Sequence, residues 1–189
     1  MKRFFSFLFF LIGVLCYLVL GYAVVERNFP KNPDFIGKSV ATNACMQQHK
    51  QPAAIKFSEL AIKLPLIPSK ITNGVWETTK DGVSYLTSSP VPGEKGNSIL
   101  YGHDFPNLLG KLPASKPGQE IEITYTDKTK KTFVIEYTSV VSPKQIDILN
   151  PTTDNRITIY TCTGFLDSER FVVVALLKEN KKETAMNHL

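Results

Sequence analysis

The chain has 189 residues, of which 43% are hydrophobic and 21% charged, and its formal net charge is +5. This length fits one ordinary domain with a single hydrophobic core, together with any anchoring or connecting segments. The positive excess is small, and the sequence has no basic stripe interleaved with aromatic residues. We therefore expect no nucleic-acid partner.

The N-terminus is basic and is followed by a long apolar run. Met1-Lys2-Arg3 precedes an almost entirely apolar segment, residues 4–25, which is long enough to cross a bilayer as a helix of about 20 residues. The positive charges predict a cytoplasmic N-terminus and an extracytoplasmic remainder. Residues 1–25 are thus expected to form a single-pass membrane anchor. A cleaved signal peptide is the alternative, supported weakly by Gly21-Tyr22-Ala23.

Polar segments lie on both sides of the central region. Residues 26–52 lack a sustained apolar period and are expected to form an extracytoplasmic stalk, and residues 181–189 a polar tail. Cys45 and His49 are four residues apart, as metal ligands on a helix can be, but no second pair lies nearby. We predict neither a metal site nor a cofactor.

Residues 53–180 have the pattern of a mainly β domain. Short runs of alternating apolar and polar residues, rich in β-branched types, are separated by Pro, Gly and Asp turns. This pattern favours an antiparallel sheet closed as a barrel or a sandwich. Strands are expected at 60–67, 74–77, 82–86, 97–101, 119–126, 131–141, 156–162 and 170–178, and short helices at 105–112 and 143–149.

Cys162 ends one of these expected strands. Along the strand, Ile157 and Ile159 fall on one face and Cys162 on the other. A polar, Gly-containing loop follows, and functional groups are often displayed at such positions. A thiolate nucleophile is one hypothesis for this residue. Burial as a small core residue and a disulfide with Cys45 are the alternatives.

Two further strand ends carry groups that would complete a cysteine acyl-transfer site. His103 follows an apolar strand, and it is the only candidate base in the β region because His49 and His188 fall in the stalk and the tail. Arg170 precedes the continuous apolar run 171–177. A guanidinium at the mouth of such a strand can donate hydrogen bonds to a developing oxyanion.

Taken together, these motifs resemble the sortases, the membrane-anchored cysteine transpeptidases of bacterial surfaces. Thr158-Ile-Tyr-Thr-Cys162 is similar to the family's Thr-Leu-x-Thr-Cys strand, with Ile159 where Leu is usual. Asn97-Ser-Ile-Leu-Tyr-Gly-His103 is similar to the family's strand ending in Gly-His, and Pro92-Gly-Glu-Lys-Gly-Asn97 to its Pro-Gly-x-x-Gly-Asn lead-in. The resemblance covers about residues 54–178.

The resemblance implies a closed eight-stranded β-barrel with short helices, and it also implies a mechanism. Cys162 would attack a peptide carbonyl within a Leu-Pro-x-Thr-Gly-like sorting motif near the C-terminus of a secreted protein, forming a thioester. His103 would protonate the leaving amine and deprotonate the incoming one, and Arg170 would hold the substrate and the oxyanion. Thr161 is expected to contact the substrate. The acceptor amine would come from a cell-wall precursor or a pilin lysine.

Two features depart from the best-known classes of the family, namely the short loop 163–169 and the compact segment 104–110. The class and the sorting motif are therefore left open.

Two alternative functions also remain. One is an L,D-transpeptidase-like enzyme, which would require a Ser-His-Gly-Cys-like segment that is missing around Cys162. Another is a non-catalytic, membrane-tethered β domain with a Cys45–Cys162 disulfide, which would leave no free thiol outside the membrane.

Overall fold

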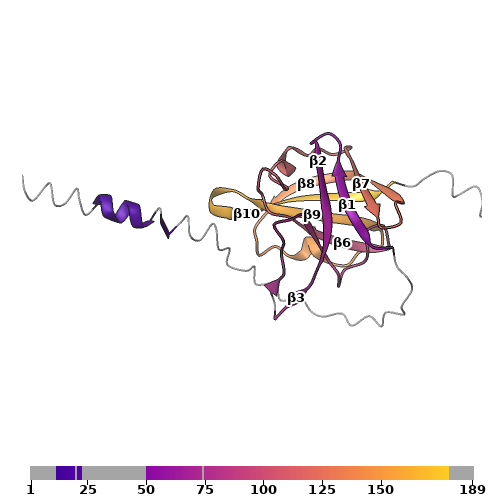
Figure 1. Ribbon diagram of the computed structural model, residues 1–189, viewed down its shortest axis with the longest axis horizontal. Helices are drawn as coiled ribbons and strands as arrows, with labels where there is room; N and C mark the ends of the chain where they lie inside the picture. Colours follow the sequence, from indigo (N-terminus) through magenta and orange to yellow (C-terminus); the bar gives the residue numbers. More distant parts are fainter. Residues whose placement is uncertain (1–11, 20, 23–49, 74, 179–189) are drawn as a thin grey trace, which may run out of the picture. The chain divides into compact units, whose positions relative to one another are not determined.

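The computed structural model describes residues 12–19, 21–22, 50–73 and 75–178 (Figure 1). The chain divides into two units, Met1–Pro33 and Asp34–Leu189. In the first unit, residues 12–19 and 21–22 are helical. Within the described ranges, no helix is both long and apolar enough to cross a membrane. The rest of the expected anchor, nearly all of the expected stalk, including Cys45, and the expected tail lie outside the described residues.

The described part of the second unit consists of strands and three short 3-10 helices. The strands are β1 (Pro52–Phe57), β2 (Ile62–Ser69), β3 (Ile71–Thr72), β4 (Val75–Trp76), β5 (Val83–Leu86), β6 (Gly96–Tyr101), β7 (Glu120–Tyr125), β8 (Lys130–Val141), β9 (Asn155–Thr163) and β10 (Glu169–Leu177). The 3-10 helices are η1 (Leu112–Ala114), η2 (Asp147–Leu149) and η3 (Phe165–Asp167).

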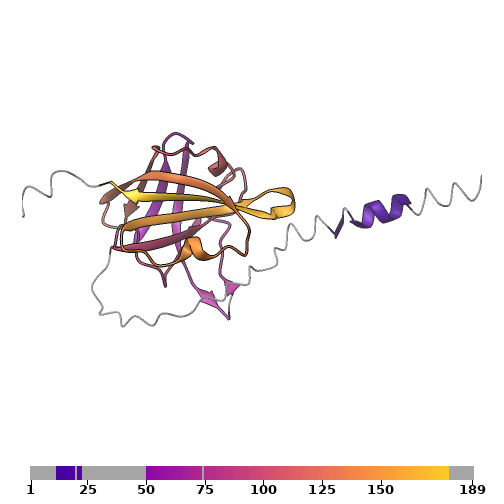
Figure 2. The same ribbon diagram turned by 180° about the vertical axis from the view of Figure 1, so that it is seen from behind.

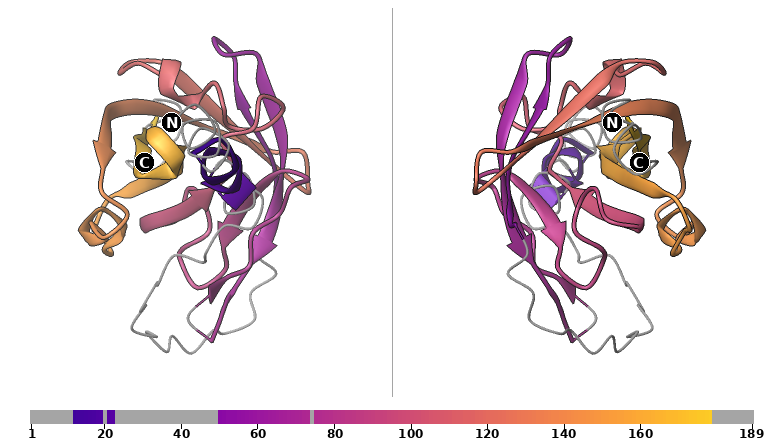
Figure 3. Two further views of the ribbon diagram at one scale, coloured as in Figure 1. Left: turned by 90° about the vertical axis from the view of Figure 1, so that its left-hand side faces the viewer. Right: turned by 90° about the vertical axis from the view of Figure 1, so that its right-hand side faces the viewer.

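Eight of the strands form a closed barrel in the order β1-β2-β5-β6-β9-β10-β8-β7, and β1 pairs with β7 to close it. The remaining two, β3 and β4, form a small separate sheet. Figures 2 and 3 show the barrel from behind and from the sides, with β1 and β2 on one side and β10 on the other. The expected eight-stranded barrel is confirmed.

The expectation of an antiparallel sheet is wrong for two of the strand pairs. β2 pairs with β5, and β6 with β9, in parallel. Both pairs arise because the chain leaves the sheet after the first strand and returns to the starting end before the second, as a parallel pair requires. The β6–β9 pair matters most, because the predicted His103 follows β6 and the predicted Cys162 lies near the end of β9.

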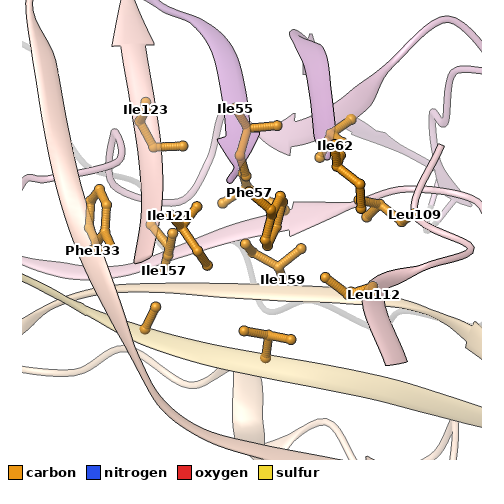
Figure 4. Packing of buried hydrophobic residues seen from close by; sticks show 14 of the residues in the cluster. Ile55, Phe57, Ile62, Leu109, Leu112, Ile121, Ile123, Phe133, Ile157 and Ile159 are labelled. Atoms are coloured by element: carbon orange, nitrogen blue, oxygen red, sulfur yellow. The ribbon is translucent and has the colours of Figure 1, made fainter. Parts of the chain in front are cut away.

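The barrel interior holds the main hydrophobic core. Ile157 and Ile159 of β9 point inward, as their alternation predicts, and are fully buried together with Phe57 and Phe133 (Figure 4). Burying one such side chain contributes about 1.5–3 kcal/mol. This packing fixes the inner face of β9, the strand that ends beside the predicted nucleophile.

The outer face of β9 and β10 is also covered. Tyr160 and Val172 belong to a second buried cluster with Trp76 of β4, and Ile148 of η2 packs against it. Because both faces are buried, β10 carries a continuous apolar run instead of an alternation, as expected of a central strand.

The segment after β6 is not the helix that we expected at 105–112. Residues 106–111 form turns, and only Leu112–Ala114 is a 3-10 helix. The backbone N–H of Leu109 donates to the carbonyl of His103 at 3.0 Å, a wider turn than the α-helix makes. The turn places Leu109 in the core. The helix expected at 143–149 is likewise reduced to Asp147–Leu149.

Candidate active site

The parallel pairing of β6 and β9 brings two strand ends together. Tyr101 lies opposite Tyr160 in this ladder. His103 and Cys162 each follow two residues later, so the period-2 alternation puts them on the same outer face of the barrel. Both side chains are half-buried, and Cys162 carries a free thiol. The structure thus brings together the predicted nucleophile and the predicted base.

Tyr101 lies between these two groups and was missed by the sequence analysis. Its hydroxyl is 3.3 Å from Nδ1 of His103 and 3.6 Å from Sγ of Cys162. The Tyr101 and His103 rings meet edge to face, with centroids 5.5 Å apart. The sequence contained one indication that Tyr101 lies near His103. The two residues are two positions apart, so in an extended chain their side chains fall on the same face.

Both the side chain of His103 and the backbone before it are tightly packed. The imidazole stacks on Phe105, with ring centroids 5.2 Å apart and an interplanar angle of 15°. A Cβ at Gly102 would lie 2.7 Å from Cδ1 of Leu109, which is a buried core residue. Glycine is therefore needed before His103 to let the backbone approach the core so closely.

Arg170 lies directly opposite Cys162 across the antiparallel β9–β10 pair. Side chains of such opposite residues share one face and lie close together. Nη1 of Arg170 donates to the carbonyls of Asp167 and Glu169, both at 2.8 Å. The loop backbone therefore holds the guanidinium of the residue that lies opposite Cys162 in the ladder.

The loop between β9 and β10 is tight and carries exposed apolar side chains. Gly164, Leu166 and Asp167 have φ angles of 79°, 52° and 60°, in the left-handed region. Phe165 is 84% exposed and Leu166 57%. In Figures 1 and 2 this hairpin projects from one end of the barrel. Arg170 thus follows a turn in which two non-glycine residues have strained backbone angles.

Opposing influences act on the thiol. Burial is the largest and raises the pKa of Cys162. The hydrogen bond with Tyr101 and the charge of Arg170 lower this pKa, whereas Asp167 and Asp104 raise it. The net pKa is above the ordinary value, so the thiol stays protonated at neutral pH in the substrate-free protein.

The imidazole is also held neutral. Burial lowers the pKa of His103 most, and the positive charge of Lys80 lowers it further. The carboxylates of Asp104 and Asp167 act in the opposite direction and raise it. A neutral imidazole beside a neutral thiol is the starting arrangement for a base that takes up a proton during a reaction.

Thr161 faces away from this surface. Its side chain is 0% exposed, and its hydroxyl donates to the carbonyl of Gly102 at 2.7 Å. The expectation that its side chain contacts a substrate is therefore corrected. The hydroxyl instead ties the cysteine strand to the residue before His103. The alternation along β9 puts Thr161 on the same face as Ile159, an indication in the sequence that the expectation did not use.

The structure also bears on the disulfide and on metal binding. The Cys45–Cys162 disulfide needs an oxidised Cys162, whereas this thiol is free and Cys45 lies outside the described residues. Among the described residues, no group of three or more His, Cys, Asp or Glu side chains could hold a metal ion.

The β region matches a known domain. The family model of the sortase domain covers residues 55–178, which include the three residues of the predicted site. This chain belongs to the sortase family. The matched region extends from β1 to the end of β10.

Named sortases resemble this one in part of their length. Sortase A of Listeria monocytogenes is 32% identical over 107 residues, which are 54% of this chain and 47% of that protein. Sortase A of Bacillus anthracis is 23% identical over 136 residues, 70% of this chain and 62% of that protein. The chain thus matches about half to three fifths of these relatives.

The fold is similar to solved sortase structures. Streptococcus agalactiae sortase C1, solved as a complex with MTSET, has a TM-score of 0.60 and 21% identity. The match covers 90% of each chain. This likeness concerns the fold, since identity is low.

Proposed function

We propose that this sortase is a cysteine transpeptidase that cleaves a sorting motif in secreted proteins and joins them to an amine at the cell surface. One observation carries the proposal: the thiol of Cys162, the imidazole of His103 and the guanidinium of Arg170 are presented together by adjoining strands. The family membership and the Sortase A relatives support it. A free, half-buried thiol flanked by a base and a cation suits nucleophilic catalysis.

In the first half-reaction, Cys162 gives up its proton and Sγ attacks the carbonyl carbon of the scissile peptide bond. The tetrahedral oxyanion that forms would accept hydrogen bonds from Arg170, which lies opposite the nucleophile. His103, now protonated, gives its proton to the leaving amine as the C–N bond breaks. A thioester between the substrate and Cys162 remains.

In the second half-reaction, an amine attacks the thioester carbonyl. His103 takes the proton from this amine, and the C–S bond breaks with Sγ as the leaving group. The thiol of Cys162 is restored when it regains the proton, and the new amide is released. Water in place of the amine would give hydrolysis, a slower competing outcome.

The substrate, the acceptor and the location are proposed from the sequence and the family. We infer a Leu-Pro-x-Thr-Gly-like motif on secreted proteins, and a cell-wall precursor or pilin lysine as the source of the acceptor amine. Residues 1–25 would anchor the chain in the cell membrane with a cytoplasmic N-terminus, and residues 26–52 would form the stalk. Residues 53–180 would be the extracytoplasmic catalytic domain, and 181–189 its tail.

The test is mass spectrometry on the full-length chain incubated with Leu-Pro-x-Thr-Gly-like peptides and an amine acceptor such as triglycine. An acyl adduct is expected on the tryptic peptide 157–170, which contains Cys162 as its one cysteine. Ligated peptide should also appear, and both products should vanish in Cys162→Ala. If no peptide forms an adduct although iodoacetamide labels Cys162 readily, the proposed substrate class is wrong. A Cys162 that resists iodoacetamide even at alkaline pH, where the thiolate forms, would favour the non-catalytic hypothesis.

A further inference from the structure

A hydroxyl group separates the predicted base from the predicted nucleophile. Within the described residues, no hydrogen bond joins Sγ of Cys162 directly to the imidazole of His103. Instead, the hydroxyl oxygen of Tyr101 lies within hydrogen-bonding distance of both, 3.6 Å from Sγ and 3.3 Å from Nδ1. A hydroxyl group can donate one hydrogen bond and accept another at the same time.

We propose that Tyr101 is a proton relay through which Cys162 delivers its proton to His103. This inference rests on the transpeptidase function proposed above, and it adds a fourth residue to the reacting groups. No direct contact between thiol and imidazole is then needed in the substrate-free protein.

The relay moves two protons and leaves the hydroxyl unchanged. The S–H bond of Cys162 breaks and its proton passes to the Tyr101 oxygen, while the O–H proton of Tyr101 passes to Nδ1 of His103. The products are a thiolate and an imidazolium. The step requires a neutral His103 with an unprotonated Nδ1, which is the tautomer with hydrogen on Nε2. Nε2, the other ring nitrogen, remains for exchange with the leaving and incoming amines.

Packing holds the Tyr101 ring in this position. Its centroid is 5.1 Å from that of Tyr160 and 6.1 Å from that of Trp76, in the cluster that covers the outer face of β9. Burial raises the pKa of Tyr101 far above its usual value. The phenol therefore remains protonated, and it transfers one proton only while it receives another.

The charged groups around the site suit the products of the relay. Arg170 on β10 faces the thiolate, and its charge lowers the pKa of Cys162. Asp104, in the segment after β6, and Asp167 of η3 raise the pKa of His103 and so favour the imidazolium. The same two carboxylates disfavour the thiolate.

Two other titratable groups complete these surroundings. Lys80, in the segment between β4 and β5, lowers the pKa of His103 and so disfavours the imidazolium. Tyr160 of β9 packs against the relay tyrosine. Because burial raises its pKa, this phenol stays uncharged when the thiolate forms.

The variant that tests the relay is Tyr101→Phe, which keeps the ring and removes the hydroxyl. Iodoacetamide labelling of the full-length chain at a series of pH values, quantified on the tryptic peptide 157–170, reports the thiolate fraction of Cys162 alone. Because a hydrogen bond to the thiolate is lost, the labelling midpoint should rise by about one to two pH units. At neutral pH the labelling rate should fall about tenfold or more.

Tyr85→Phe is the matched control. It removes a tyrosine hydroxyl that donates to Gln51 at 2.7 Å, from a residue of the interior cluster. Its labelling profile should match that of the unaltered chain. If Tyr101→Phe also matches the unaltered chain, the relay is refuted, whatever its effect on peptide transfer. If Tyr101→Phe shifts the profile while no peptide is transferred by the unaltered chain, the relay stands and the proposed function fails.

A second measurement needs no tyrosine variant. Nitrogen-15 NMR of the full-length chain labelled at histidine, with the His103 signals assigned by their loss in His103→Asn, reports which ring nitrogen carries hydrogen. The relay requires the neutral imidazole to carry hydrogen on Nε2. A neutral His103 with hydrogen on Nδ1 would overturn it. In turnover, Tyr101→Phe should lower kcat about 10- to 100-fold and leave KM nearly unchanged.

Discussion

Thr161→Val tests whether one buried hydroxyl holds the two halves of the site together. Valine has nearly the shape of threonine, so the change removes the hydroxyl and leaves the carbonyl of Gly102 without the partner now at 2.7 Å. Leaving a buried polar group unsatisfied costs about 1–3 kcal/mol. Because Thr161 is fully buried, water cannot take the place of the hydroxyl without a rearrangement. We expect the free energy of unfolding to fall by this amount.

The same change should also lower activity. The bond joins the residue before Cys162 to the residue before His103, so its loss loosens the spacing between thiol and imidazole. We expect kcat for peptide transfer to fall about tenfold, since small displacements of reacting groups are costly. Thr161→Ser, which keeps the hydroxyl, should retain most of the rate.

Urea unfolding measures the first effect, and thermal unfolding should show a melting temperature lower by roughly 3–12 °C, as expected for a domain of this size. Steady-state transfer assays measure the second. If Thr161→Val is as stable and as active as the unaltered chain, the carbonyl of Gly102 does not depend on this bond. The structural role assigned to Thr161 would then be wrong.

Four further changes give distinct outcomes. Cys162→Ala should abolish transfer and change the free energy of unfolding by less than about 1 kcal/mol, because a half-buried thiol contributes little packing. Arg170→Lys should lower kcat about 10²- to 10³-fold, because an ammonium cannot reproduce the planar fork. Gly102→Ala should destabilise the fold by about 1–3 kcal/mol, because its Cβ would lie 2.7 Å from Cδ1 of the buried Leu109. His103→Gln should remove a pH-dependent part of the stability. Burial lowers the pKa of His103, so its contribution is present above about pH 6.5 and is lost as the pH falls from there through the folded pKa.

A specific result would contradict each of these four predictions. An Arg170→Lys enzyme with nearly full kcat would remove the oxyanion role from Arg170, and a Cys162→Ala enzyme that still ligates peptides would place the nucleophile elsewhere. Full stability of Gly102→Ala, measured by urea unfolding, would mean that Leu109 moves aside. Equal loss of stability between pH 7 and pH 5 in His103→Gln and in the unaltered chain would assign that loss to other groups.

The sequence predicted the strands well where alternation is strong. The run from Ile157 to Cys162 sorts its side chains correctly between the interior and the outer face, since period 2 is a local property of an extended chain. β1 was not delimited in advance, because Ala53 and Ala54 give it a weak alternation.

Other features depend on contacts that a local pattern does not contain. The parallel pairing of β6 with β9 joins residues about 60 positions apart, and alternation does not name a partner strand. The helix expected at 105–112 failed because the backbone of Leu109 bonds back to His103 and the side chain enters the core. Tyr101 was missed for a related reason, since its neighbour Cys162 becomes visible only once the strands are paired.

The parallel β6–β9 pair has a consequence for engineering. The residues of the proposed site lie at or just beyond the end of this ladder, at Tyr101 and Tyr160, and the segments that leave both strands begin side by side at that edge. The hairpin turn 164–168 lies beyond this ladder. The exposed side chains at its tip, Phe165 and Leu166, can therefore be varied to alter which peptides reach the thiol, while Asp167 and Glu169, whose carbonyls hold Arg170, are kept. Libraries of such variants at 165 and 166 would separate peptide preference from the groups proposed to make and break bonds.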